Sequence, residues 1–488
     1  MDKLSTPEKN FTTDAINAIE MQDIKDEWDS EADESIPSTE KEKCGKQREW
    51  SELPSLSLDR IYSFLSRADQ INMSQVCRKW SEGYSSPSVW KIFRFYLTDS
   101  ELAMDTCPEI KFARKYSSMF RHVEIVCRRI NLQLIDTSWR HLKVFLNILS
   151  INSQLHSVKF KYLGNYLRQL DTPIYDDIFR AIANLLQFQH HLKRVEFHDC
   201  HFQFEEAVEL LKDITENSRE SLTHLVLKGF VHDEPIDQEL DSTVAQSLST
   251  LVNQRFPKLA TLETDYSLIF DNMFARQTVD TDTSKSCQMR GLSRIILHCY
   301  GFRQGNFRGL TSATWRSLKQ LCPDLQVELY FVPGPQSRRE IDSFVLPDMP
   351  ITLLDYRLDR IHASAIIEID ALFNHLLACR TNDYLVSLYL VWMMPIHDLA
   401  SAFIPFLQAC AKLKCLQLFT LFPVNGIDLL IRSWLENRPE SLEEVLISIS
   451  NVRNEDDYIS LTTLVDEYAP VLQVMGLNVF LIFDHGRR

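Results

Sequence analysis

A short apolar motif recurs along most of this chain, and its spacing constrains the fold more than any other feature. Each copy reads Leu-x-x-Leu-x-Leu or an apolar variant, and successive copies begin roughly 26 to 37 residues apart. A repeat period in this range indicates a solenoid, in which each unit buries its apolar edge against its neighbours. The copies begin at residues 120, 155, 192, 222, 259, 292, 325, 351, 385, 413, 442 and 477.

The segments between these copies carry apolar residues at helical spacing. Three clear stripes are Ile178, Ile182, Leu185 and Leu186; Trp315, Leu318, Leu321 and Cys322; and Ile427, Leu430, Ile431, Trp434 and Leu435. Pro323 and Pro439 follow two of them, where a helix must end. Strands alternating with helices at this period are the leucine-rich-repeat architecture. We therefore predict an α/β solenoid of irregular leucine-rich repeats over residues 119–484, with parallel strands inside and helices outside.

Residues 50–90 have a different pattern, typical of a small all-α unit. Two stripes spaced i, i+3, i+4 and i+7 predict two helices, with Leu58, Ile61, Tyr62 and Leu65 on the first and Met73, Val76, Cys77 and Trp80 on the second. Asp69 is placed to cap the second helix. A unit of about 40 residues is normally too small to hold a core alone, so we expect it to dock on another surface.

The same residues resemble the F-box. The resemblance rests on Leu53-Pro54, on I-Y-S-F-L from Ile61, on V-C-R-x-W from Val76 and on a final Trp90. It implies binding to the Skp adaptor and, through it, to the cullin of a ubiquitin ligase. The implied adaptor-binding residues are Leu53, Pro54, Leu58, Ile61, Leu65, Val76 and Trp80.

Two positions depart from the usual F-box pattern. Leu56 stands where Glu is common, and Gln70 stands where Leu is usual. Gln70 is expected to remove one apolar contact, which puts the affinity for the adaptor in doubt. The alternative is an ordinary helical hairpin that packs on the rest of the chain.

An F-box followed by irregular leucine-rich repeats is similar to the F-box only proteins, and most similar to F-box only protein thirty-nine and its relatives. The narrower similarity is carried by residues 315–331 and by E-S-L-E-E-V-L-I from Glu440 with Y-A-P-V-L from Tyr468. On this interpretation residues 1–48 are a disordered acidic tail, 49–95 the F-box and 96–118 a connector to the solenoid.

Composition limits the partners and the compartment. The first 49 residues hold fourteen Asp and Glu against seven Lys and Arg, about half of the chain's net charge of -15. No basic stripe is visible in the sequence, which argues against nucleic-acid binding. Eleven cysteines without a CxxC pair, no apolar leader and no apolar run of membrane length predict a cytoplasmic or nuclear protein without a membrane partner.

The sequence predicts no enzyme, no metal and no cofactor. The nearest approach to a metal site is His198-Asp199-Cys200-His201, but Cys200 fits the buried ladder position of a repeat. A zinc site needs four converging ligands, and the sequence offers no second pair at short spacing. There is also no GxSxG nucleophile motif.

A protein substrate is expected on the concave face of the solenoid. In each copy the residue between the second and third apolar positions points onto that face, and aromatic residues and Met are enriched in binding patches. The predicted substrate-binding residues are Ile296, Tyr389, Trp392, Gln417 and Leu446. The alternative is that Trp392, Met393 and Met394 pack under a loop.

These observations predict the substrate-recognition subunit of a Skp–cullin–F-box ubiquitin ligase, which binds an unknown protein substrate and performs no catalysis itself. The alternative is a leucine-rich-repeat scaffold with an F-box-like hairpin that acts outside ubiquitin ligation. Copurification with the adaptor and the cullin distinguishes the two.

Overall fold

The computed structural model describes residues 53–65, 67–87, 89–97, 107–127, 134–167, 169–232, 256–268, 291–300, 310–333, 340–358 and 369–484. The predicted acidic tail, residues 1–48, lies outside the described residues. The chain divides into two compact units, Met1–Arg194 and Val195–Arg488.

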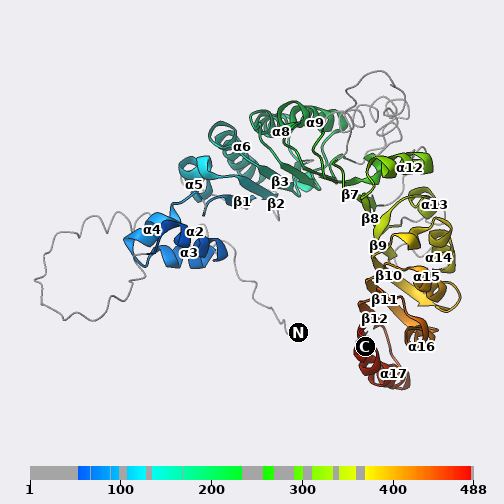
Figure 1. The fold of residues 1–488 in the computed structure, drawn as a ribbon. Helices are drawn as coiled ribbons and strands as arrows, with labels where there is room; N and C mark the ends of the chain where they lie inside the picture. The colour runs from blue at the N-terminus through cyan, green and yellow to red at the C-terminus, as the bar shows by residue number, and fades with distance from the viewer. Residues whose placement is uncertain are drawn as a thin grey trace, which may run out of the picture. The chain divides into compact units, whose positions relative to one another are not determined.

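The first unit begins with three short helices and continues with strands that alternate with helices (Figure 1). The three helices are α2 (Ser55–Phe64), α3 (Arg67–Ser74) and α4 (Arg78–Tyr84). The strands are β1 (Ile92–Leu97), β2 (His122–Cys127) and β3 (Ser157–Lys161), and they pair in parallel in this order. The larger helices among them are α5 (Pro108–Tyr116), α6 (Ile135–Asn152) and α8 (Thr172–Gln187).

An aromatic cluster joins the three helices to the first strand. The indole nitrogen Nε1 of Trp90 donates a hydrogen bond to the Tyr84 carbonyl at 2.7 Å, and its ring lies 4.4 Å from the Phe112 ring between centroids. Phe95 stacks on Phe145 at 4.2 Å. The sheet therefore begins at Ile92, and β1 and α5 lie where the sequence predicted the end of the F-box and a connector. The prediction missed β1 because Ile92–Leu97 lacks the Leu-x-x-Leu-x-Leu pattern.

The second unit contains ten strands in the described residues, and their order in the sheet follows the chain. They are β4 (Arg194–His198), β5 (His224–Lys228), β6 (Thr261–Asp265), β7 (Arg294–Tyr300), β8 (Gln326–Val332), β9 (Ile351–Leu358), β10 (Ser387–Ile396), β11 (Cys415–Val424), β12 (Glu444–Ser450) and β13 (Asn478–Asp484). The main helices are α9 (Phe204–Ser218), α12 (Ser312–Leu321), α13 (Glu340–Phe344), α14 (Ile369–Ala378), α15 (Phe403–Ala409), α16 (Ile427–Asn437) and α17 (Glu455–Val474).

The α/β solenoid predicted from the repeats is confirmed. A strand follows each of the twelve predicted motif starts, and the strands from β9 to β13 pair in parallel with helices on one side of them (Figure 1). The burial pattern explains the motif: in β12, Val445, Ile447 and Ile449 are buried under the helices, and Leu446 and Ser448 between them are half-exposed.

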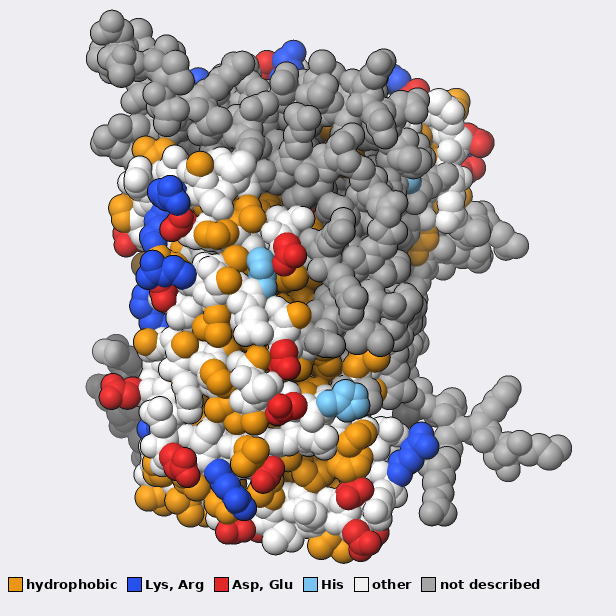
Figure 2. Space-filling model, turned by 90° about the vertical axis from the view of Figure 1, so that its right-hand side faces the viewer, with side chains coloured by type: hydrophobic (Ala, Val, Ile, Leu, Met, Phe, Trp, Pro, Cys, Tyr) orange, Lys and Arg blue, Asp and Glu red, His pale blue; other side chains and the backbone are white. Residues whose placement is uncertain are grey.

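The helices end where the prolines predicted. α12 ends at Leu321 and α16 at Asn437, each two residues before its proline. The face toward the viewer in Figure 2 mixes hydrophobic, acidic and basic side chains among the described residues, as expected of solvated outer helices. Within the part of the chain that is described, no helix is long and apolar enough to cross a membrane.

The register of the sheet shifts once between β8 and β9. Val327 lies opposite Ile351, but Glu328 lies opposite Leu353, so Thr352 is an extra residue in β9. Asp355 is consequently the neighbour of Tyr330 and not of Glu328. The predicted row of concave-face residues is therefore continuous from Asp355 through Tyr389, Gln417 and Leu446, but Glu328 belongs to a different row.

Candidate protein-docking surfaces

Among the three helices of residues 53–87, α4 packs against one side of α2 and α3 packs against α4. Leu58 and Tyr62, one turn apart on α2, are buried, and the Tyr62 hydroxyl donates a hydrogen bond to the Trp80 carbonyl at 2.6 Å. Burial raises the pKa of Tyr62, so this hydroxyl keeps its proton as a donor. The Leu58–Tyr62 pair therefore holds α2 against α4. The sequence predicts Leu58 as a contact of the adaptor, but the structure places its side chain in the interior of the helical unit.

The second predicted stripe does not lie on one helix. α3 ends at Ser74 and α4 begins at Arg78, because Cys77 between them is extended, with φ -162° and ψ 164°. The turn brings Tyr84 to Tyr62, with ring centroids 6.0 Å apart. Tertiary packing thus overrides the helical spacing of Met73, Val76, Cys77 and Trp80. Asp69 also lies within the first turn of α3 rather than before it.

Gln70 is an interior residue and not a surface one. Its amide nitrogen Nε2 donates hydrogen bonds to the carbonyls of Tyr62 at 2.8 Å and Leu65 at 3.3 Å. These carbonyls belong to the last turn of α2, where four backbone acceptors lack partners within a helix. The expectation that Gln70 weakens an apolar contact is corrected, because the side chain holds the C-terminal end of α2.

Large apolar side chains remain exposed on α2 and on the turn between α3 and α4. Leu56 is 83% exposed, Phe64 77% and Val76 61%. Rotation of about 100° per residue places Leu56 and Phe64 about 80° apart, on the side of α2 that faces away from Leu58 and Tyr62. Of the other predicted adaptor contacts, Pro54 is exposed and Leu53, Ile61, Leu65 and Trp80 are half-buried. We call Leu56, Phe64 and Val76 the F-box apolar surface; Phe64 lies off the stripe that the sequence predicts for this helix.

A second apolar surface lies on strands β10 to β13, on the face that their helices do not cover. Register pairs Tyr389 with Gln417, Gln417 with Leu446 and Leu446 with Phe480. The next row contains Val391, Phe419, Ser448 and Ile482. Phe480 is 54% exposed and Ile482 53%, and the remaining members are half-exposed. We call these two rows the C-terminal open face.

Two predicted substrate-binding residues do not belong to this face. Trp392 alternates with Leu388 and Leu390 on the helix side of β10, is 3% exposed and stacks on Tyr356 with centroids 6.1 Å apart. Trp392 is therefore a packed residue, as in the alternative, but it packs against Tyr356 of β9 rather than under a loop, and Met393 and Met394 are half-exposed. Ile296 is buried between Glu263 and Glu328, and the register shift after Val327 separates its row from that of Tyr389.

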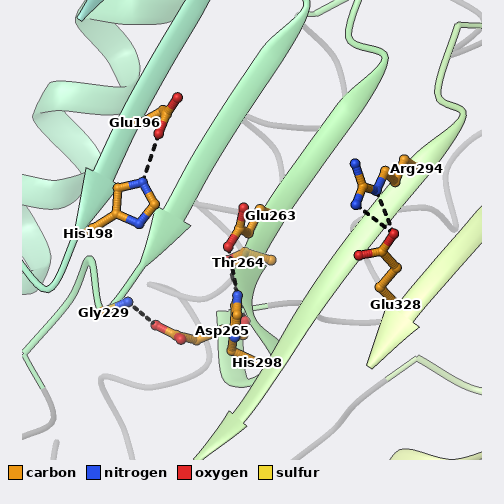
Figure 3. A network of polar contacts seen from close by, with 9 residues as sticks. All are labelled: Glu196, His198, Gly229, Glu263, Thr264, Asp265, Arg294, His298 and Glu328. Carbon is orange, nitrogen blue, oxygen red and sulfur yellow. Dashed lines mark hydrogen bonds and ion pairs between the residues drawn. The ribbon is translucent and has the colours of Figure 1, made fainter. Parts of the chain in front are cut away.

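Polar side chains occupy the middle strands of the second unit (Figure 3). His198 Nε2 lies 2.8 Å from Glu196 Oε2, and His298 Nε2 lies 2.8 Å from Glu263 Oε1. Farther along the sheet, Arg294 donates to Glu328 at 2.7 Å through Nε. The His298–Glu263 contact joins β6 to β7 and the Arg294–Glu328 contact joins β7 to β8, whereas His198 and Glu196 both lie on β4, so each carboxylate has a His or Arg partner.

The pKa of Glu263 illustrates how these pairs act. Burial raises its pKa, but the hydrogen bond from His298 and the charges of His298, His198 and Lys228 lower it more. The net pKa of Glu263 lies below its ordinary value, so the group stays ionised at neutral pH.

One cluster has the order of a nucleophile, a base and an orienting acid. Cys379 Sγ lies 3.4 Å from His375 Nε2, and His375 Nδ1 lies 3.1 Å from Asp342 Oδ1. Cys379 is buried, however, and burial raises the pKa of its thiol, which disfavours the thiolate that nucleophilic catalysis requires. The cluster therefore packs α14 against the segment around Val345, whose carbonyl contacts both His375 and Cys379.

The prediction that Cys200 occupies a buried ladder position of the repeat is confirmed, because its side chain is fully buried. Asp199 and His201 on either side adopt positive φ angles of 53° and 51°. Within the described ranges, no three His, Cys, Asp or Glu side chains form a group that could hold a metal ion.

Residues 50–91 match the family model of the F-box domain, and the chain therefore carries an F-box domain at this place. Two curated relatives, F-box/LRR-repeat protein 21 of Bos taurus and of Mus musculus, are 27% and 26% identical over 120 residues. The similar stretch covers 24% of this chain and 25% of each relative. The predicted F-box is confirmed, and the narrower relation to F-box only protein thirty-nine stays a prediction.

Proposed function

We propose that this chain is the substrate-recognition subunit of a Skp–cullin–F-box ubiquitin ligase. The observation that carries the proposal is an F-box domain that presents Leu56, Phe64 and Val76 to solvent and is followed by a leucine-rich-repeat solenoid. Large exposed apolar side chains on a small unit are typical of a protein-docking surface.

The F-box apolar surface docks the Skp adaptor, and the adaptor brings the cullin. Removing apolar side chains from water drives the association, at roughly 25 cal/mol for each Å² buried. Pro54 is exposed and Leu53, Ile61, Leu65 and Trp80 are half-buried, so each keeps solvent-accessible area that the adaptor can cover. Leu58 contributes indirectly, because it is buried against the other helices.

The solenoid holds the substrate, with the C-terminal open face as its docking surface. Tyr389, Leu446 and Phe480 are aromatic or aliphatic anchors on adjacent strands, and Gln417 lies between them as a polar contact. Holding a substrate near the ubiquitin-conjugating enzyme raises its effective concentration, so the chain acts by positioning and uses no cofactor. Its place of action is the cytoplasm, the nucleus or both.

Copurification of the full-length chain with the adaptor and the cullin tests this proposal. We expect Phe64→Ser combined with Val76→Ser to lose the adaptor, because losing two apolar anchors costs about 2–4 kcal/mol, an affinity change of about 30-fold or more. Leu53→Ala with Pro54→Ala should act in the same direction. Val474→Ser, which removes a side chain that is 90% exposed on α17, is the matched control and should retain the adaptor.

Failure of the wild-type chain to bind the adaptor and the cullin would favour the scaffold alternative. An adaptor that binds the wild type and the Phe64→Ser, Val76→Ser variant equally would instead place the docking surface elsewhere on the F-box.

A further inference from the structure

Four basic residues of the first unit form one row, each directly before one of the strands β1 to β4. The Lys91 carbonyl accepts hydrogen bonds from the backbone N–H groups of Arg121 and His122, and the Arg121 carbonyl accepts one from His156. The His156 carbonyl accepts one from Lys193. Lys91, Arg121, His156 and Lys193 therefore occupy equivalent positions before four successive strands. We call them the basic row.

The side chains of the basic row reach solvent. Lys91 and Lys193 are exposed, and Arg121 and His156 are half-exposed. The Arg121 guanidinium is held in place, because its Nη1 donates to the carbonyls of Ser118 at 2.9 Å and Phe120 at 2.8 Å.

The charges around His156 are consistent with one electropositive surface, since the cations of the row all act on its imidazole. Burial lowers the pKa of His156, and the charges of Lys193, Arg121 and Lys91 lower it further. All three cations are thus close enough to oppose a fourth positive charge. The row consequently presents three cations and a neutral imidazole at neutral pH.

The face of the sheet beside the row is also basic. Arg94, Lys159 and Lys161 lie on β1 and β3, around Glu124 on β2. Glu124 Oε2 lies 2.8 Å from Arg94 Nε, and its Oε1 lies 2.6 Å from Lys161 Nζ. Glu124 thus forms an ion pair with both Arg94 and Lys161, and these three groups together carry a net positive charge.

The size and surroundings of the row favour a short acidic peptide over a nucleic acid. Strands lie about 4.8 Å apart, so four equivalent positions span about 14 Å, which an extended peptide of a few residues covers. A nucleic acid continues well beyond such a span, so most of its phosphates would meet no cation of the row, and the chain's net charge of -15 adds no attraction.

We propose that the basic row binds an acidic segment of a partner protein, with carboxylates placed against Lys91, Arg121 and Lys193. The identification of that partner as a substrate rests on the proposed receptor function. The row and the C-terminal open face then act as separate anchors with different chemistry, one for carboxylates and one for apolar side chains.

The test is a fluorescence-anisotropy titration of the full-length chain with a labelled peptide of alternating Glu and Gly. We expect the Glu peptide to bind and the matched peptide of Gln and Gly not to bind. Binding should weaken when salt rises from about 0.1 M to about 1 M, since the Debye length falls from about 10 Å to about 3 Å.

Two charge-matched variants locate the binding surface. Lys91→Ser with Lys193→Ser should weaken binding of the Glu peptide several-fold, because it removes two cations of the row. Lys111→Ser with Arg140→Ser removes the same charge from exposed positions on α5 and α6 and should leave binding unchanged. Equal affinity for the two variants overturns the proposal.

Three further results would overturn it. The first is no binding of the Glu peptide at low salt. The second is tighter binding of a single-stranded oligonucleotide with the same dependence on the row. The third is binding that appears only after Asp26, Glu27, Asp29, Glu31, Asp33 and Glu34 are neutralised, which would make the chain's own acidic segment the occupant. Copurification of the adaptor with the same variants is independent of all three, so failure here is distinguishable from failure of the ligase proposal.

Discussion

Gln70 shows how a single polar residue can belong to the interior of a small helical domain. Its two hydrogen bonds reach the carbonyls of Tyr62 and Leu65 at the end of α2, and the Tyr62 carbonyl also accepts one from the Leu65 backbone N–H. A buried acceptor that loses its partner costs about 1–3 kcal/mol. The amide therefore contributes to the stability of the F-box, where the sequence suggested only a missing apolar contact.

We expect Gln70→Glu to destabilise the F-box by about 1–3 kcal/mol at neutral pH, because a carboxylate cannot donate to the carbonyls of Tyr62 and Leu65. The buried Glu would have a raised pKa in the folded state, so its penalty is full above that pKa. Stability should return in part as the pH falls and the carboxyl group gains a proton. Urea unfolding followed by tryptophan fluorescence at pH 7 and pH 5 measures the change.

Gln75→Glu is the control. Gln75 is exposed just after α3, so this substitution introduces the same charge into solvent. An unfolding midpoint for Gln70→Glu equal to that of the control would show that the two hydrogen bonds contribute little.

At the scale of elements, strands β10 to β13 show how the alternation of side chains between the two faces of a strand decides which residues can contact a partner. Side chains along a strand point to opposite faces, so Tyr389 and Trp392, three residues apart, lie on opposite sides of the sheet. Trp392 packs beneath the sheet and Tyr389 lies on the C-terminal open face. Phe480 and Ile482 extend that face onto β13, which the sequence placed only as a degenerate repeat.

Phe480→Ser with Ile482→Ser should remove proteins held by the solenoid while leaving the fold and the adaptor in place. Both side chains are more than half exposed, so the loss of stability should stay within about 0.5 kcal/mol for each. The measurement compares proteins that copurify with the variant and with the wild type, with the adaptor as internal reference. An unchanged set of copurifying proteins beyond the adaptor and the cullin would contradict a role for the C-terminal open face.

Val445→Ser is the matched structural control on the neighbouring strand. Val445 is fully buried on the opposite side of the sheet, so this change should lower stability in the manner of a core substitution. If the Phe480→Ser, Ile482→Ser variant and the Val445→Ser variant both unfold and both lose the captured proteins, the loss reflects unfolding and does not support a docking role.

At the scale of the whole molecule, burial controls the chemistry of the cysteines. Of the nine cysteines in the described residues, Cys77 and Cys415 are half-exposed and the others are buried. Burial is the largest influence on Cys107 and Cys410 and raises their pKa values to about 11 and about 12. The thiolate is the reactive form, so buried thiols should be inert near neutral pH.

We expect iodoacetamide at pH 8 to alkylate Cys77 well before Cys107 in the native chain. A thiol of pKa about 11 is only about 0.1% ionised at pH 8, and Cys107 also lacks solvent access. Mass spectrometry of the two peptides over time measures the rates, and urea should bring them close together. Equal rates without urea would mean that the segment around Cys107 opens readily.

The sequence by itself determined the repeating strand and helix architecture and the position of the F-box. Both follow from local patterns: a strand motif needs alternation, a helix needs apolar residues every three or four positions, and each can be read in a short window. The twelve motif starts and the helix ends before Pro323 and Pro439 are of this kind.

Only the tertiary structure decided which residues become neighbours. The break at Cys77, the inward amide of Gln70, the register shift at Thr352 and the burial of Trp392 all depend on packing between elements. The basic row is the clearest case, because Lys91, Arg121, His156 and Lys193 are about 30 or more residues apart and show no stripe in sequence. A parallel sheet brings one residue from each repeat into line, so charge that is scattered along the chain gathers on a surface that no local window can reveal.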